Sequence, residues 1–211
     1  ARARVPHVIW STLEDTRRWI PLDDPRMPTL MGTYKVPHFD AKGEADRFFT
    51  ELGVPTTFLL ASFYWDNLLS SGPKPGPDGT PTLVLPIGNA KMAGVAASDI
   101  GRVAYALFAG GAKHIGQRVG AAGELLTGAE MAAKMTRALG TTVRFQDVPP
   151  EVFRGFGFPG ADDLGNMFQF YRDFADVCNA TRDVARCRAL VPGMMDFDAW
   201  LARHARSIPL K

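Results

Sequence analysis

The segment His38-Phe39-Asp40-Ala41-Lys42-Gly43-Glu44, together with the residues that follow it up to position 60, decides the fold class of this chain. Pro37 suits the first turn of a helix, and Gly53 suits the position just after a helix ends. Between them, four apolar residues recur at helical spacing: Ala45, Phe48, Phe49 and Leu52. We therefore predict a helix over 37–52 that packs this apolar face on a sheet, followed by a buried strand over 56–60.

Another strand is predicted before this helix. Residues 7–12 form a short apolar run that ends in two hydroxyls, Ser11 and Thr12, a pattern typical of a strand buried on both faces of a parallel sheet. Residues 13–37 are rich in helix and strand breakers and predict a loop, with a short helix over 13–19. A strand, a helix and a strand joined by short links predict an α/β fold with a doubly wound parallel sheet, in which residues 7–12 are a central strand.

Further strands and a covering helix are predicted in the middle of the chain. Residues 71–81 are dense in glycine and proline and predict an exposed loop. Residues 82–87 and 116–125 predict strands, and Ser98 can cap a helix that ends at Gly110. We assign residues 1–126 to this sheet domain.

The remaining residues, 127–211, predict a smaller and mostly helical region that is interleaved with the sheet domain. Thr127 and Glu130 form a capping box at the start of one helix, and Asp196 can cap the last one. Apolar residues at helical spacing predict a longer helix over 164–178 between them.

Composition excludes several classes of function. The chain has 211 residues, of which 46% are hydrophobic and 22% charged, and its net charge of +2 is scattered, so we expect no direct binding of nucleic acid. The longest apolar run, residues 58–65, is far shorter than the roughly 20 residues of a membrane span. Cys178 and Cys187 lack metal-ligand spacing, so we expect no metal site and two reduced thiols. A cytoplasmic location is predicted by elimination.

His38 and Lys42 lie one helical turn apart and therefore share one face of the predicted helix. This arrangement and the order of elements resemble the NmrA-like family, an atypical branch of the short-chain dehydrogenase-like folds. Residues 98–101, Ser-Asp-Ile-Gly, and residues 158–168, which contain Pro-Gly-Ala-Asp-Asp-Leu-Gly-Asn-Met, are similar to two segments of that family. The resemblance implies a Rossmann-like domain that binds NAD or NADP, with the helical region as substrate or cap region.

The resemblance also implies roles for His38, Lys42 and Ser11. In the related folds, a lysine four residues after a tyrosine holds the nicotinamide ribose and lowers the pKa of the phenol, which then exchanges a proton with the substrate. Lys42 keeps the lysine position and is expected to bind the cofactor, whereas the tyrosine position is His38. Ser11 corresponds to a substrate-orienting hydroxyl. Lys42 could instead be an exposed surface lysine, His38 a capping or surface residue, and Ser11 a turn former.

Four more residues are implied at the nicotinamide end of the cleft: Thr12, Ser62, Tyr64 and Asn67. Thr12 ends the first strand, and open parallel sheets bind ligands beyond the carboxyl ends of their strands. The other three follow the next strand, where the Arg-Pro pair usual in the family is replaced. Asn67 could equally bond local backbone groups, and aromatic residues at such a position are more often core.

A glycine-rich phosphate motif of the form G-x-x-G-x-x-G is absent from this sequence. Gly120-Ala-Ala-Gly123 lacks the third glycine and is interpreted as a turn. The chain therefore resembles about the last two-thirds of an NmrA-like protein, from near its fifth strand, and alone it should bind dinucleotides poorly. We expect the free edge of the 7–12 strand to be covered by further strands, from the same chain or from a protein partner or second copy.

Three functions stay open at this point. The first is an NAD(P)(H)-binding, redox-responsive regulator without dehydrogenase catalysis, which the histidine at the tyrosine position favours. The second is an NAD(P)H-dependent reductase of quinone-like acceptors, because hydride transfer depends more on position than on a proton donor. The third is an interaction module without a cofactor.

Overall fold

The computed structural model describes residues 3–210, and its centre is a three-stranded parallel sheet. The strands are β1 (Val8–Thr12), β2 (Thr56–Leu60) and β7 (Arg118–Gly120), in the order β1-β2-β7. Trp10 lies opposite Phe58, and Leu59 lies opposite Val119. Every residue of β2 is buried, as a strand between two parallel neighbours requires.

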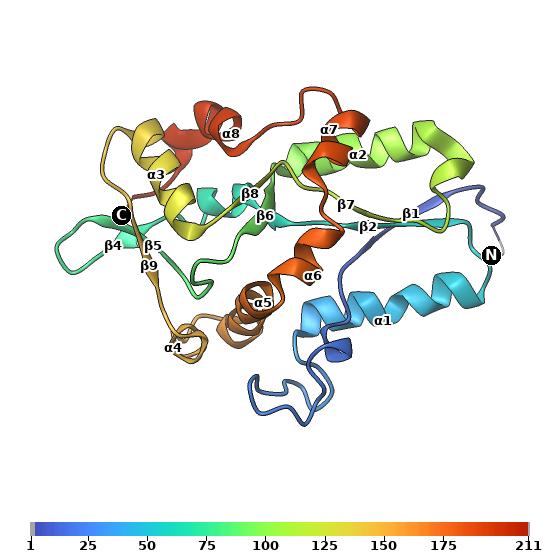
Figure 1. Ribbon diagram of the computed structural model, residues 1–211, viewed down its shortest axis with the longest axis horizontal. Helices are drawn as coiled ribbons and strands as arrows, with labels where there is room; N and C mark the ends of the chain where they lie inside the picture. The colour runs from blue at the N-terminus through green and yellow to red at the C-terminus, as the bar shows by residue number, and fades with distance from the viewer. Residues whose placement is uncertain (1–2, 211) are drawn as a thin grey trace.

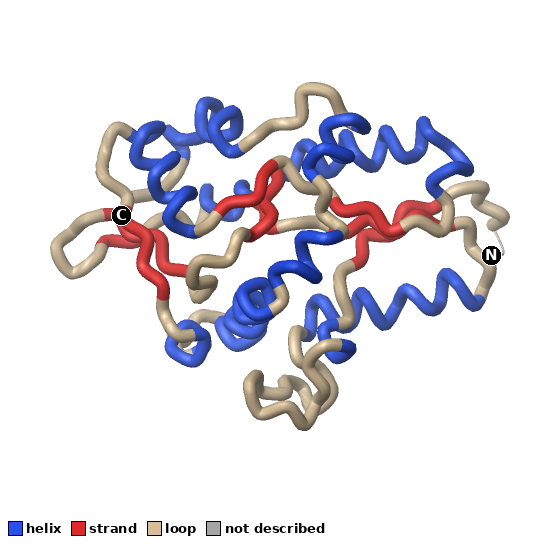
Figure 2. Tube along the Cα trace, viewed as in Figure 1, coloured by secondary structure: helices blue, strands red, loops and turns tan. Residues whose placement is uncertain are grey.

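Helices cover both faces of this sheet (Figures 1 and 2). α1 (Pro37–Glu51) lies on one face and α2 (Ala97–Gly110) on the other. The α2 side encloses its own hydrophobic cluster, which includes Leu59, Val103 and Leu107. The predicted α/β fold with a parallel sheet and covering helices is confirmed.

β1 has one free edge among residues 3–210, as expected for this segment, and its central position in a larger sheet stays a prediction. Only β2 pairs with it among residues 3–210, and its residues are mostly half-buried, with Ser11 exposed. The apolar sequence of β1 matches a strand with neighbours on both sides, and here one edge lacks a neighbour.

The ends of α1 are as predicted, but the face that it buries is different. Pro37 occupies the first turn, and Gly53 follows the helix with a φ of +61°. Phe48 and Leu52, predicted to face the sheet, are 51% and 63% exposed. Phe49 does face it, with its ring 4.9 Å from that of Trp10.

Asp40 and Gly43 explain the inward face of α1. The buried Asp40 carboxylate accepts hydrogen bonds from the backbone N–H and the hydroxyl of Thr16, and from the backbone N–H groups of Lys35 and Val36. Gly43 allows close approach, because a Cβ there would lie 2.7 Å from the backbone nitrogen of Asp15. These polar bonds to the preceding loop fix the rotation of the helix, and hydrophobic spacing does not reveal them.

Two smaller sheets continue the fold beyond β2. One contains β3 (Phe63–Tyr64), β6 (Met92–Val95) and β8 (Glu124–Leu126), and the other contains β4 (Lys74–Pro75), β5 (Pro81–Leu85) and β9 (Arg144–Asp147). β5 confirms the strand predicted over 82–87, whereas β6 and β9 were not predicted.

The single strand predicted over 116–125 is wrong, because this segment forms both β7 and β8. The backbone N–H of Ala121 donates to Leu60, whereas that of Gly123 donates to Gly94. The chain thus changes its pairing partner from β2 to β6 between the two short strands.

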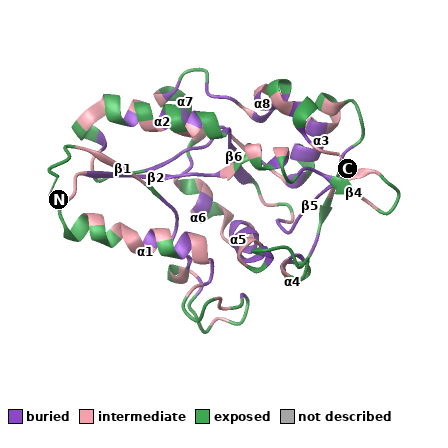
Figure 3. Ribbon diagram, turned by 180° about the vertical axis from the view of Figure 1, so that it is seen from behind, coloured by how far each residue is buried: buried purple, intermediate pink, exposed green. Residues whose placement is uncertain are grey.

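The C-terminal part is mostly helical. It contains α3 (Gly128–Leu139), α4 (Pro150–Arg154), α5 (Ala161–Asp173), α6 (Ala175–Ala180), α7 (Val184–Leu190) and α8 (Phe197–His204). The capping box of Thr127 and Glu130 and the cap by Asp196 are confirmed. Short 3₁₀ helices complete the fold: η1 (Thr16–Arg18), η2 (Trp65–Leu69), η3 (Gly111–His114) and η4 (Ala205–Ser207). Figure 3 shows exposed residues along the outer sides of these helices. The division at residue 126 stays a prediction.

Two helix boundaries differ from the sequence-based expectation. The helix predicted over 164–178 is broken into α5 and α6 at Phe174, which leaves the helical conformation and stacks its ring on Phe170. Ser98 is not the cap of α2. The helix begins at Ala97, whose N–H donates to the carboxylate of Asp66 in η2, 2.7 Å away.

Candidate functional site

His38 lies in the first turn of α1 and is held by a residue of α5. Its Nδ1 is 2.7 Å from Oδ2 of Asp163, and its ring meets the ring of Phe39 edge-on at 4.8 Å. A carboxylate only accepts hydrogen bonds, so Nδ1 is the protonated nitrogen in this contact. Nε2 has no hydrogen-bond partner among residues 3–210, and the side chain is 37% exposed.

Asp163 is placed for this contact by the start of α5. It lies in the first turn of the helix, where the partial positive charge of the N-terminus favours a carboxylate. Its Oδ2 accepts from His38, whereas its Oδ1 is buried without a hydrogen-bond partner in the described part of the chain.

Lys42 follows His38 by one turn, beside the end of β1. It is half-buried, and its ammonium makes no hydrogen bond or ion pair within residues 3–210. Its backbone carbonyl accepts a hydrogen bond from the Thr12 hydroxyl at 3.4 Å. The structure therefore brings Thr12 and Lys42 together and leaves the charged end of Lys42 available.

The hydroxyls of β1 and the residue after β2 differ in exposure. Ser11 is exposed at the end of β1, whereas Thr12 is fully buried and bonds only backbone carbonyls. Ser62 is buried and donates to the carbonyl of Ala121 at 2.6 Å. Ser11 is thus the hydroxyl of this group that is open to a ligand.

Tyr64 and Asn67 lie on the surface side of β3 and η2. Tyr64 is 36% exposed, and Asn67 is exposed. The backbone carbonyl of Asn67 accepts from the N–H groups of Ser70 and Ser71, so this residue forms a turn. The roles assigned to both residues stay predictions.

The segment 158–168 contributes more to the site than its sequence indicated. Asn166 ties the segment to the loop before α1, because its Nδ2 donates to the carbonyls of Lys35 at 2.6 Å and Pro28 at 3.0 Å. The same segment supplies Asp163. Sequence reasoning missed Asp163 because 125 residues separate it from His38.

A second residue that sequence reasoning missed is Arg182, between α6 and α7. It is fully buried and donates to Glu14 Oε2 at 3.0 Å and to the carbonyls of Ala61 and Cys178 at 3.0 and 2.7 Å. Burial alone would lower the pKa of Arg182, but the Glu14 carboxylate reverses this and raises it. The pair thus links the segment after β1, which contains Glu14, to the segment after β2, which contains Ala61.

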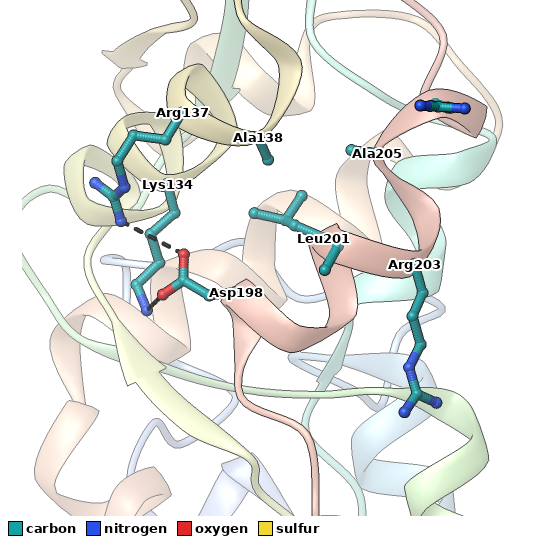
Figure 4. A pocket seen from close by; sticks show the side chains of 9 residues that line it. Lys134, Arg137, Ala138, Asp198, Leu201, Arg203 and Ala205 are labelled. Carbon is teal, nitrogen blue, oxygen red and sulfur yellow. Dashed lines mark hydrogen bonds and ion pairs between the residues drawn. The ribbon is translucent and has the colours of Figure 1, made fainter.

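Three cavities are found on the surface of the described chain. One of about 620 Å³ lies along α1 and Arg118, one of about 240 Å³ lies between α1 and α6, and one of about 590 Å³ lies between α3 and α8. Figure 4 shows the last, in which Lys134 and Arg137 are directed toward Asp198. None of the predicted site residues lines these three cavities.

A parallel sheet with helices on both faces is the arrangement of a Rossmann-like α/β protein. The NmrA-like family model matches residues 1–201. The chain belongs to the NmrA-like family.

Solved structures share this fold at low sequence identity. NmrA, a negative transcriptional regulator, has a TM-score of 0.72 and 21% identity, over 97% of this chain and 64% of the NmrA chain. NmrA structures in complex with NAD and with NADP are similar to the same extent. An NADPH-dependent quinone oxidoreductase from Escherichia coli has a TM-score of 0.68 and 18% identity, over 96% of this chain and 68% of that one. Triphenylmethane reductase from Citrobacter sp., complexed with NADP(H), has a TM-score of 0.66 and 15% identity, over 97% and 66%.

These likenesses show the fold. This chain spans about 64% of the length of the NmrA structures. Within residues 3–210, every helix falls short of the length and apolar character that a membrane crossing needs.

Proposed function

We propose that this chain binds the nicotinamide end of NAD(P)(H) and acts as a redox-responsive regulator without classical dehydrogenase catalysis. The observation that carries this proposal is Lys42, a half-buried residue whose backbone lies beside the end of β1 and whose ammonium has no hydrogen-bond or ion-pair partner within residues 3–210. A ribose hydroxyl pair is a suitable acceptor for such a group. The NAD and NADP complexes of NmrA support the choice of ligand.

The residues present fit the nicotinamide and ribose half of the cofactor. Lys42 would hold the ribose, and His38 and the exposed Ser11 would lie near the nicotinamide. The cofactor, when bound, supplies or accepts a hydride.

Tyr34 and Tyr171 are both poor substitutes for the phenol of the related dehydrogenases, which supports regulation over dehydrogenase catalysis. Tyr34 lies outside α1, where the guanidinium of Arg17 covers its ring at 5.1 Å. Tyr171 packs against Phe39 near the start of α1, but burial raises the pKa of its phenol far above the range of a useful acid or base. Neither tyrosine takes the place of the tyrosine whose position is occupied by His38 in this chain.

The test combines cofactor titration with turnover. We expect weak binding of NADPH by the wild-type chain and no NADPH oxidation above background with a panel of quinones. His38→Tyr restores a phenol one turn before Lys42, and gain of carbonyl reduction by this variant would explain the lost catalysis. Robust turnover by the wild type would overturn the regulator proposal.

A second candidate, an NAD(P)H-dependent reductase of quinone-like acceptors, is favoured by the contact between His38 and Asp163. A carboxylate that orients an imidazole is a common arrangement for acid and base catalysis. The similar E. coli quinone oxidoreductase and Citrobacter reductase make such acceptors a reasonable panel.

The third candidate is an interaction module without a cofactor. The open edge of β1 could pair with a strand of a protein partner or of a second copy. Absence of any binding of NAD(H) or NADP(H) would favour this candidate over the other two.

A further inference from the structure

The contact between His38 and Asp163 joins α1 to α5 in one defined geometry. Two charged groups would attract each other in several geometries, whereas here Nδ1 and Oδ2 lie 2.7 Å apart and the ring is also fixed edge-on against Phe39. The imidazole is thus held on two sides, and only its Nε2 edge lacks a protein partner within residues 3–210.

The chemistry of Asp163 determines which nitrogen of His38 carries the proton. An ionised carboxylate has no hydrogen to donate, so the neutral imidazole satisfies it only as the Nδ1–H tautomer. The opposite tautomer would place the lone pair of Nδ1 against a carboxylate oxygen. The first turn of α5 supports the negative charge of Asp163.

We propose that Asp163 is the positioning residue of His38: it fixes the Nδ1–H tautomer and leaves Nε2 as the ring nitrogen that meets the nicotinamide end of the cofactor. The first part of this inference stands on the contact alone. The second part rests on the proposed function, because it needs a dinucleotide held by Lys42 on the same face of α1.

This assignment gives Nε2 a defined role in each protonation state. In the neutral ring, Nε2 accepts a hydrogen bond, for example from a ribose hydroxyl. In the protonated ring, it donates one. Asp163 itself touches neither the cofactor nor a substrate and exchanges no proton.

The tautomer is directly measurable by NMR of the full 211-residue chain labelled with ¹⁵N-histidine. The chain has four histidines, and His38→Gln assigns the signals of the one of interest. At a pH at which the ring is neutral, we expect His38 to be predominantly Nδ1–H, the form that free imidazole side chains disfavour in water. A predominant Nε2–H form in the wild type would overturn the proposal without any variant.

Substitution of Asp163 provides the second arm. Asp163→Asn presents an amide that can donate as well as accept, so we expect loss of the Nδ1–H predominance. Asp162→Asn is the matched control: it removes the same charge one residue earlier, and the Asp162 carboxylate contacts only the backbone N–H of Asp163, at 2.8 Å. Asp163→Glu keeps an acceptor and should keep the Nδ1–H form. Equal tautomer ratios in Asp163→Asn and Asp162→Asn would overturn the assignment.

Titration with NADPH separates this inference from the proposed function. We expect NADPH to shift the Nε2 resonance of wild-type His38, and Lys42→Ala to need about 5- to 30-fold more NADPH for the same shift while leaving the tautomer unchanged. An unchanged tautomer with no binding by the wild type would contradict the proposed function alone. Binding that leaves the Nε2 resonance in place would contradict the role of Nε2.

Discussion

Glu14–Arg182 and His38–Asp163 both join the N-terminal part of the chain to its C-terminal helices, but they differ in burial. Arg182 is fully buried, Glu14 is 5% exposed, and the guanidinium is hydrogen-bonded to Glu14 and to the carbonyls of Ala61 and Cys178. The side chains of His38 and Asp163 are 37% and 24% exposed, and Nε2 of the histidine has no partner within residues 3–210.

This difference separates a structural contact from a candidate functional one. A buried and fully bonded pair has no group left for a ligand, so its consequences should be seen in stability. A half-exposed pair contributes little to stability. Substitution of His38 or of the neighbouring Lys42 should therefore change the affinity for a ligand.

The largest effect is expected for the buried pair. Arg182→Met leaves the Glu14 carboxylate buried without its partner, and loss of one member of a buried pair costs about 3–5 kcal/mol. Urea denaturation should show this loss in the free energy of unfolding. Arg172→Met removes a third-exposed arginine that pairs only with the adjacent Asp173, and should cost less than about 1 kcal/mol.

A double variant checks the cause of that loss. Glu14→Gln combined with Arg182→Met removes both charges, and it should be more stable than Arg182→Met alone because no charge is left buried. A double variant that is as unstable as the single one would attribute the loss to packing of the guanidinium.

At the open site, the effect should appear in affinity. Lys42→Ala should weaken NADPH binding by about 1–2 kcal/mol, the scale of a charge-assisted hydrogen bond, with thermal stability nearly unchanged. Arg47→Ala, on the same helix and 58% exposed, is the control and should bind as the wild type does. Equal affinities of all three proteins would reduce Lys42 to a surface lysine.

The half-exposed pair should have a small effect on stability. Asp163→Asn and His38→Ala should each lower the free energy of unfolding by no more than about 1 kcal/mol. Chemical denaturation of these two variants and of Arg182→Met, under the same conditions, compares their losses in the free energy of unfolding. A loss as large as that of Arg182→Met would make His38–Asp163 a structural contact and remove the distinction between the two.

At neutral pH, the smallest effect is expected from the two buried thiols. Burial raises the pKa of Cys178 to about 12 and also raises that of Cys187. In the unfolded chain a thiol ionises near pH 8.5, so the folded state holds its protons more tightly and stability should fall as pH rises above about 8.5. At pH 8 a thiol reagent should modify the cysteines only after denaturation, and rapid modification of the folded chain would show that this region opens.

Local patterns in the sequence predicted part of the fold. Pro37 and Gly53 mark the ends of α1, and the capping box at Thr127 marks the start of α3, because these signals act within a few residues. The inward face of α1 depends instead on the buried Asp40, whose partners lie 24 residues away at Thr16 and in the preceding loop. The split of residues 116–125 into β7 and β8 depends on pairing with two different strands, which no local pattern contains.

The candidate site shows the same limit. The spacing of His38 and Lys42 follows from helix geometry, so the sequence could place them on one face of α1. Asp163 and Arg182 reach their partners across 125 and 168 residues, and only packing of the whole chain brings them there. The sequence therefore predicted the two residues on the helix and missed the residues that hold the site in place.

The most direct test of the account compares two halves of the cofactor. The chain offers Lys42 and His38 for the nicotinamide half, and its sequence has no glycine-rich motif for the adenosine half. We predict by titration calorimetry that reduced nicotinamide mononucleotide binds the wild type within about tenfold of NADPH, that Lys42→Ala weakens both, and that ADP-ribose does not compete. Binding of ADP-ribose but not of reduced nicotinamide mononucleotide, or equal affinities of the wild type and Lys42→Ala, would contradict the account.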